Sequence, residues 1–243
     1  MYFTHWPLLL LAISAVFAGS VIQGSTGLGL GMVAAPVLLL IDPRLVPGPL
    51  LVLALLISVL VAAREWRSID RRGLSMALVG RLAGSVLAGF TITLLPLYAY
   101  NLLFGILVLG AVALSATGWR VLPTGRNLLT AGLASGYMGT LTSIGAPPMA
   151  LAYQHGSPAS IRATMAVYFV VGSAFSIVVL VTMGRFGAHQ ALAGAVFIPP
   201  LVAGFWLSER VVRRLNGRLM RHAILWLSGA SAAILIIKAL LEH

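Results

Sequence analysis

The sequence predicts an all-α protein, a bundle of helices that cross a lipid bilayer several times. Its 243 residues are 60% hydrophobic and only 9% charged, and the mean hydropathy is +1.02. A soluble chain of ordinary composition is about a quarter charged. Several uncharged runs also reach the roughly 20 residues that cover the hydrocarbon core of a bilayer. A β-barrel is excluded because barrel strands alternate apolar and polar residues over short stretches.

Composition also excludes several functions. The chain has no cysteine, so disulfides, thiolate metal sites and a cysteine nucleophile are ruled out. The net charge of +11 does not indicate nucleic-acid binding, because the arginines fall between apolar runs and not on one polar face. We expect no cofactor, no metal site and no enzyme activity, since HExxH, GxSxG and paired carboxylates are missing from the sequence.

Apolar runs and helix breakers divide the chain into two similar sets of five segments: a first repeat at 1–118, a cytoplasmic linker at 119–126 and a second repeat at 127–243. The first set is predicted at Leu8–Gly24, Met32–Ile41, Pro49–Ala63, Gly73–Leu95 and Leu97–Thr117. The second is predicted at Asn127–Thr142, Met149–Gln154, Ala163–Met183, Ala188–Ser208 and His222–Leu241. The first segment carries no basic n-region before it, so we expect it to be a retained helix and not a cleaved leader.

The second segment of each half, Met32–Ile41 or Met149–Gln154, is too short to span a bilayer at about 1.5 Å per residue. We therefore predict that each half begins with a broken helical hairpin, whose tip turns back inside the membrane, and continues with three full spans. Because three crossings are an odd number, the second half is predicted to be an inverted repeat of the first.

The positive-inside rule predicts the orientation. Twelve of the sixteen basic residues fall on one side in this topology. They are Arg64, Arg67, Arg71, Arg72, Arg120, Arg126, Arg162, Arg210, Arg213, Arg214, Arg218 and Arg221. Only Arg44, Arg185 and Lys238 fall on the other. This bias predicts a bacterial inner-membrane protein with both termini outside, although hairpins that cross completely would give the same parity.

The two hairpin tips are the predicted substrate region. A helix broken at membrane depth leaves backbone N–H and C=O groups that need protein or water partners. The half-helix that follows each tip also directs its N-terminal N–H groups at the break, which favours an anion. The predicted binding residues are Gln23, Gly24, Ser25, Thr26, Gly27, Thr142, Ser143 and Gly145. The alternative is that small residues permit close helix packing, and we favour that alternative for Gly84, Gly89, Gly105 and Gly110.

Arg81 is the remaining candidate, because it is the only charge in its predicted span. An arginine inside the membrane is costly and needs a partner or a cavity, and no acidic residue lies within any predicted span. Its planar paired donors suit an oxoanion. Two alternatives remain: the side chain snorkels to the interface, or it binds carbonyl groups at a hairpin tip.

The pattern of small residues resembles the TauE/SafE sulfite exporter family. The matching residues are Gly19, Gly24, Thr26-Gly27-Leu28-Gly29, Gly31 and Pro36, with Gly139 and Gly145 in the second half. The resemblance implies a duplicated helical transporter of sulfite, sulfoacetate or related anions, with protons as the expected coupling ion. Pro147-Pro148 departs from the glycine-rich pattern at the second tip.

We therefore predict a transporter of a small oxoanion that works by alternating access and has three kinds of partner: an anionic substrate, the lipid bilayer and protons. A small-anion channel and a structural membrane subunit that transports nothing are the alternatives. We expect no nucleic-acid partner, and a homodimer is left open.

Overall fold

A computed structural model describes residues 6–71, 73–117, 121–153 and 157–211, together with residues 225–226, 229–230, 233–234, 236–237 and 240. Throughout these residues the regular structure is helical, which confirms the all-α prediction. Five helical segments are long and apolar enough to cross a membrane, and one bent pair of helices would make a sixth. The chain is therefore a multi-pass membrane protein.

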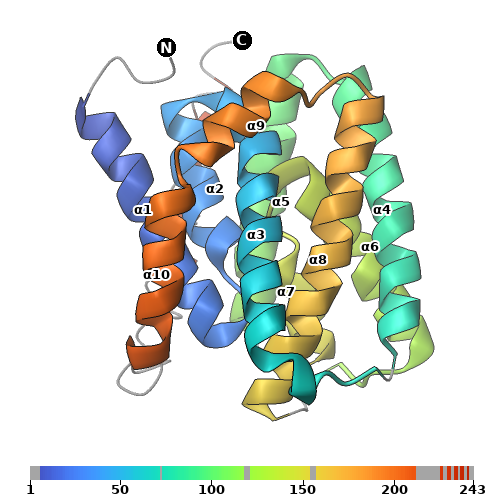
Figure 1. The fold of residues 1–243 in the computed structure, drawn as a ribbon. Helices are drawn as coiled ribbons and strands as arrows, with labels where there is room; N and C mark the ends of the chain where they lie inside the picture. The colour runs from blue at the N-terminus through green and yellow to red at the C-terminus, as the bar shows by residue number, and fades with distance from the viewer. Residues whose placement is uncertain are drawn as a thin grey trace.

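The first half forms a long helix, a glycine break, a shorter helix and three further long helices (Figure 1). They are α1 (Trp6–Thr26), α2 (Leu30–Ile41), α3 (Gly48–Glu65), α4 (Leu74–Leu94) and α5 (Leu97–Thr117), with single 3₁₀ turns at Pro43–Leu45 and Trp66–Ser68. The break between α1 and α2 contains Gly27 at φ 82° and Gly29 at φ 136°. These left-handed conformations favour glycine and end the helix there.

The second half repeats this order as far as the structure describes it. Its helices are α6 (Gly125–Thr142), α7 (Ala146–Ala152), α8 (Pro158–Thr182), α9 (Ala188–Ala195) and α10 (Ile198–Val211). Thr124 and Ser157 cap α6 and α8 by accepting backbone N–H groups on their hydroxyls. Residues 119 and 120 of the predicted linker, Gln154 and most of the predicted segment His222–Leu241 lie outside the described residues.

Two predicted details of the breaks are corrected. The α1 helix runs without interruption through Gly24 and ends at Thr26, so the first break comes at Gly27–Gly29. Pro147 and Pro148 do not break a helix but lie in the first turn of α7. Proline fits there because the first N–H groups of a helix have no intrahelical partner.

The segment predicted as one span at Ala188–Ser208 is not one continuous helix: α9 and α10 are bent by 47°, and together they are apolar enough to form a broken span. Pro199 and Pro200 begin α10. Neither can donate the backbone hydrogen bond to a carbonyl four residues earlier, and each ring crowds that carbonyl. The bend therefore falls just before them, at residues 196–197.

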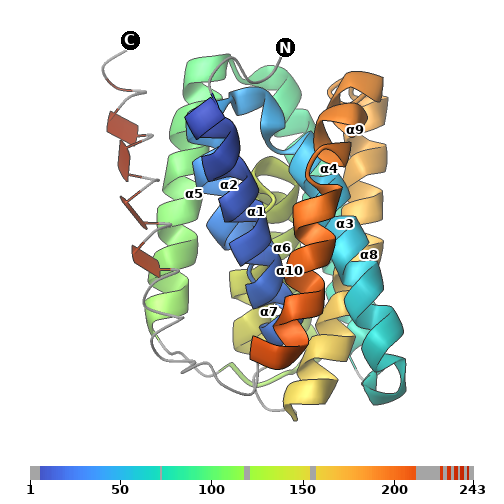
Figure 2. The same cartoon turned by 60° about the vertical axis from the view of Figure 1, so that its left-hand side comes forward.

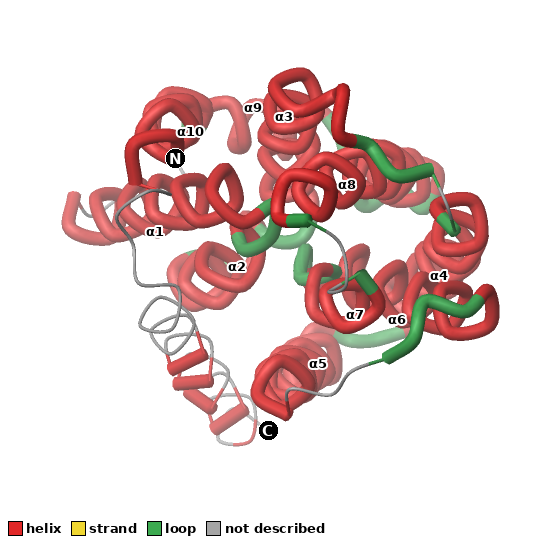
Figure 3. Tube along the Cα trace, turned by 90° about the horizontal axis from the view of Figure 1, so that it is seen from below, coloured by secondary structure: helices red, strands yellow, loops and turns green. Residues whose placement is uncertain are grey.

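Helices of the two halves pack in matching pairs, α4 with α6, α3 with α8 and α1 with α10 (Figures 1 and 2). The short helices α2 and α7 lie inside the ring that the longer helices make (Figure 3). A two-fold relation between the halves would exchange α1 with α6, α3 with α8 and α4 with α10. It would turn the α4–α6 pair into the α10–α1 pair and the α3–α8 pair into itself, as the observed pairings require. The inverted repeat itself stays a prediction.

The α4–α6 contact is made through glycines on both helices. A Cβ atom on Gly80 or Gly84 would overlap the backbone of α6, and one on Gly132 or Gly136 would overlap the carbonyl of Ala77 or Arg81. The packing interpretation of Gly84 is thus confirmed. This close approach brings the backbone of α6 to the helix that carries Arg81.

The connections between helices gather at two ends of the bundle. The Arg44 end, at the top of Figure 1, holds residues 42–47, 95–96 and 184–187, which connect neighbouring helices. The Arg64 end holds residues 66–71, 73, 121–124 and 157.

Candidate functional site

The two breaks meet inside the bundle. A Cβ atom on Gly31, in the first turn of α2, would overlap the carbonyl of Ser143 at the second tip. Gln23, one turn before the end of α1, stabilises the first break by accepting a hydrogen bond from the Leu30 N–H on Oε1 (3.0 Å). Its Nε2 donates to the Ser58 hydroxyl on α3 (3.3 Å). The two tips therefore lie against each other, and Gln23 orders one side of their contact.

The second tip turns at Ser143, whose φ of 61° is the left-handed value that ends α6. The Thr142 hydroxyl donates to the Met138 carbonyl (2.7 Å) and accepts from the Ile144 N–H (3.1 Å). The Ser143 hydroxyl donates to the Pro47 carbonyl, at the start of α3 (3.1 Å). The bond from the Ile144 N–H satisfies a backbone donor that the break would otherwise leave without a partner.

Arg81 lies seven residues into α4, about 10 Å along the helix, and its exposed fraction is 1%. Its Nη1 donates to the backbone carbonyl and to the hydroxyl (3.2 Å) of Ser135 on α6. The Ser135 hydroxyl in turn donates to the Gly145 carbonyl (2.5 Å). Arg81 therefore does not snorkel to the interface, and it is linked through one serine to the second tip.

Three glycines surround the guanidinium. A Cβ atom on Gly139 of α6, Gly145 of the tip or Gly172 of α8 would overlap Nη1 or Nε of Arg81. The aromatic rings of Tyr168 and Phe169 lie 5.8 and 5.9 Å from its Cζ atom, within the range of a cation–π contact. The charge is therefore held by a carbonyl, a hydroxyl and two rings.

No carboxylate in the described ranges pairs with Arg81; the four ion pairs found there involve Arg44, Arg64 and Arg162. The buried Nε atom of Arg81 has no hydrogen-bond partner. An arginine at the centre of a membrane helix costs about 3 kcal/mol on insertion scales. The protein therefore holds a buried positive charge whose donors are only partly satisfied.

A small cavity of about 30 Å³ lies between the two tips and Arg81. Its lining includes Gln23, Gly29, Gly31, Arg81, Gly139, Ser143, Gly145, Phe169 and Ser173. Such a volume holds one or two water molecules. In this conformation the central cavity is thus too small for a sulfur oxoanion.

Four predicted site residues, Gln23, Arg81, Ser143 and Gly145, line this cavity. The other five do not, and their polar groups are used elsewhere. Ser25 donates to carbonyls of Val21 and Ser208, and Thr26 donates to carbonyls of Ile22 and Leu28. Gly24 and Gly27 face α10 and α8, where a Cβ atom would meet the side chain of Ser208 or the backbone of Arg162. Thr142 only stabilises its own turn.

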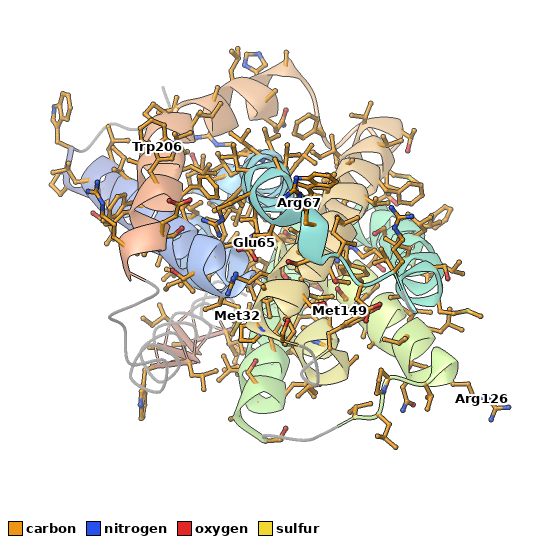
Figure 4. All side chains as sticks on the ribbon, turned by 60° about the horizontal axis from the view of Figure 1, so that its bottom comes forward. Met32, Glu65, Arg67, Arg126, Met149 and Trp206 are labelled. Atoms are coloured by element: carbon orange, nitrogen blue, oxygen red, sulfur yellow. The ribbon has the colours of Figure 1, made fainter. Side chains whose placement is uncertain are left out.

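The sequence did not indicate an ion-pair network at the Arg64 end. Arg64 donates to the Gly24 carbonyl near the end of α1 and to the Ser208 hydroxyl on α10. Glu65 accepts from Arg64 (3.2 Å) and from Arg162 on α8 (2.7 Å). Figure 4 looks toward this end and shows Glu65 within the bundle and Arg126 at its periphery. Sequence reasoning counted these arginines only as topology signals; the polar pair Arg64-Glu65 at the end of an apolar run was the one available hint.

The fold and this site define a class: a polytopic helical membrane protein in which two broken helices meet at a buried cation, as in transporters that bind an anion near the midplane. The family model for the sulfite exporter TauE/SafE matches residues 11–235. The chain therefore belongs to the TauE/SafE family of membrane transporters for sulfite and related anions. No curated protein and no solved structure matches it.

Proposed function

We propose that the protein carries sulfite or an organosulfonate such as sulfoacetate across a bacterial inner membrane by alternating access. The observation that supports this most is Arg81, a buried guanidinium that lacks a carboxylate partner within the described ranges and lines a cavity between two helix breaks. An oxoanion with at least two acceptor oxygens would accept hydrogen bonds from the N–H groups of Arg81 that the protein leaves unbonded. Its negative charge would also neutralise the charge of the guanidinium.

Four of the predicted site residues are proposed to contact the substrate. Arg81 supplies charge and N–H donors, while Gln23 and Ser143 supply neutral polar groups at the two tips. Gly145, like Gly29 and Gly31, lets backbone approach the anion closely because it has no side chain. The other predicted tip residues are proposed to shape the breaks and not to touch the substrate.

The small cavity supports an occluded conformation within an alternating-access cycle. In this proposal the Arg64 end faces the cytoplasm, because Arg64, Arg67, Arg71, Arg126, Arg162 and Arg210 lie there among the described basic residues. The two halves are proposed to be inverted repeats that open alternately around the central cavity. Protons remain the proposed coupling ion.

The proposal is tested by uptake and counterflow of radiolabelled sulfite and sulfoacetate in proteoliposomes. Losing paired, charge-assisted bonds costs about 1.5–3 kcal/mol, so Arg81→Lys should lower uptake at subsaturating substrate about 10- to 100-fold. It keeps a positive charge but not the planar donors. Arg126→Gln, an exposed arginine at the Arg64 end, is the matched control and should transport at the wild-type rate.

Saturation and counterflow distinguish a transporter from a channel, in which flux rises linearly with concentration. Folding is checked by gel filtration and by the unfolding temperature, with and without substrate. Wild-type transport by a folded Arg81→Ala variant would show that the arginine serves structure alone. Absence of flux for every sulfur oxoanion tested on the wild-type protein would disprove the proposed function itself.

A further inference from the structure

A second and larger cavity opens at the Arg44 end of the bundle. Its volume is about 460 Å³, against about 30 Å³ for the central cavity. Three connections between helices line it, those of α2 to α3, α4 to α5 and α8 to α9. We call it the vestibule. It is large enough for an organic molecule of several carbon atoms, which the central cavity in this conformation is not.

The vestibule combines an apolar wall with a positive rim. The wall is formed by proline, valine, leucine and isoleucine side chains, among them Val46, Leu95 and Leu180. Three charged residues line the same cavity, namely Asp42, Arg44 and Arg185. An apolar wall beside a cationic group suits a molecule with an apolar body and an anionic head.

The charges of Asp42 and Arg44 offset each other. Arg44 donates to both carboxylate oxygens of Asp42, with Nη2 to Oδ2 at 2.8 Å and Nε to Oδ1 at 3.0 Å. Burial opposes ionisation of Asp42, but the hydrogen bonds and the charge of Arg44 outweigh it and lower the pKa of that carboxyl. Arg185 joins none of the ion pairs in the described part of the chain. The vestibule therefore carries one net positive charge.

The vestibule and the central cavity are separated by a thin layer. Pro47 lines the vestibule, and its carbonyl accepts the bond from Ser143, which lines the central cavity. Tyr100 also lines the vestibule, and its hydroxyl donates to the Leu141 carbonyl at the end of α6 (2.7 Å). Separation of the second tip from these two residues would join the cavities.

We propose that the vestibule is a second binding site, which takes an organic sulfonate by its charged head at Arg185 and its apolar body against the wall. That the site lies on the substrate path rests on the proposed function; that it binds such an anion does not. Sulfonates with an apolar body are therefore the substrate class that this end of the protein selects, ahead of bare inorganic oxoanions.

The absence of cysteine from the whole sequence makes a direct test simple. Leu95→Cys places one thiol in the vestibule wall, and Ala188→Cys places one on an exposed position that does not line it. Both variants, in nanodiscs of neutral phosphatidylcholine, are labelled with two methanethiosulfonates of similar size, one bearing a sulfonate and one a trimethylammonium group. Rates are normalised to those of a free small thiol.

For two unit charges roughly 7 Å apart in a water-like dielectric, attraction of one reagent and repulsion of the other give roughly a sevenfold difference in rate at low salt, so an unpaired positive charge beside the thiol should favour the anionic reagent by about that factor. The Leu95→Cys protein should show this preference for the anionic reagent. Adding Arg185→Gln to that protein should remove the preference, and adding Arg126→Gln should leave it unchanged. Equal normalised rates for the two reagents, or a preference that survives Arg185→Gln, would overturn the assignment of the charge.

Protection tests the amphipathic character of the ligand. Butanesulfonate should slow labelling of Leu95→Cys at least fivefold and leave Ala188→Cys unaffected, while sulfate and butanol at the same concentration should protect neither. Equal protection by sulfate, or no protection by butanesulfonate, would overturn the proposal. Protection by added phosphatidylglycerol alone would assign the site to a lipid headgroup and overturn it too.

The result is independent of transport. Labelling needs only a folded protein, so an Arg81→Lys variant with reduced flux should keep the charge preference and the protection by butanesulfonate. If transport is lost but the vestibule keeps its charge preference and its protection, the second site is still supported. If transport is normal but the vestibule shows neither, only the second site is disproved.

Discussion

Gly172 provides the most direct test of the buried-arginine site, because its substitution displaces the guanidinium without removing its charge. A Cβ atom on Gly172 would overlap Nε of Arg81 and lie 3.1 Å from Cζ. Arginine side chains usually move aside at little cost, but this one is enclosed by Gly139 and Gly145 and is held by Ser135. Gly172→Ala should therefore move the guanidinium out of its bonds.

The magnitude follows from three contributions. Overpacking a filled interior costs about 1–3 kcal/mol. Loss of the charge-assisted bonds to Ser135 costs about 1.5–3 kcal/mol. The alanine returns about 1 kcal/mol of helix propensity. We expect a net loss of about 1.5–5 kcal/mol in the free energy of unfolding, together with loss of substrate-induced stabilisation.

The assay is equilibrium unfolding in mixed micelles, followed by tryptophan fluorescence, alongside proteoliposome uptake. Gly110→Ala is the matched control, since a Cβ atom there meets nothing within 4 Å and the residue lies on the exposed side of α5. It should leave both stability and uptake within error or raise stability slightly. If Gly172→Ala is as stable and as active as Gly110→Ala, the guanidinium is not confined as described here.

Two further predictions concern the ends of the bundle. Glu65→Gln should lower the free energy of unfolding by about 1–2 kcal/mol, between the values for exposed and buried ion pairs, because Arg64 and Arg162 lose a shared carboxylate. The control is Glu209→Gln, whose side chain is 63% exposed. Similar stability of the two variants would contradict the prediction. At the other end, the lowered pKa of Asp42 means that its pairing with Arg44 contributes stability above the ordinary carboxyl pKa and loses it as pH falls through the folded value. Unfolding temperatures of wild type and Asp42→Asn, measured between about pH 3 and 6, should converge at the acid end; a constant difference would refute this.

The sequence by itself determined the membrane class, most helix positions and the location of the breaks to within a few residues. These properties depend on local quantities: the length of uncharged runs and the conformational freedom of Gly27 and Gly29. It also identified Arg81, because a lone charge in an apolar span is visible without knowing its neighbours. Family membership followed from the same small-residue pattern.

Only the tertiary structure decided which groups meet. The rotation of α6 and α8 about their axes places Gly139 and Gly172 against Arg81, and no local pattern specifies that rotation. The same applies to Arg64, which reaches a carbonyl 40 residues away in sequence, and to the hydroxyls of Ser25 and Thr26, which bond backbone groups and leave the cavity to Gln23. Helix packing fixes these contacts because a small helix rotation moves a side chain from a cavity to a neighbouring backbone.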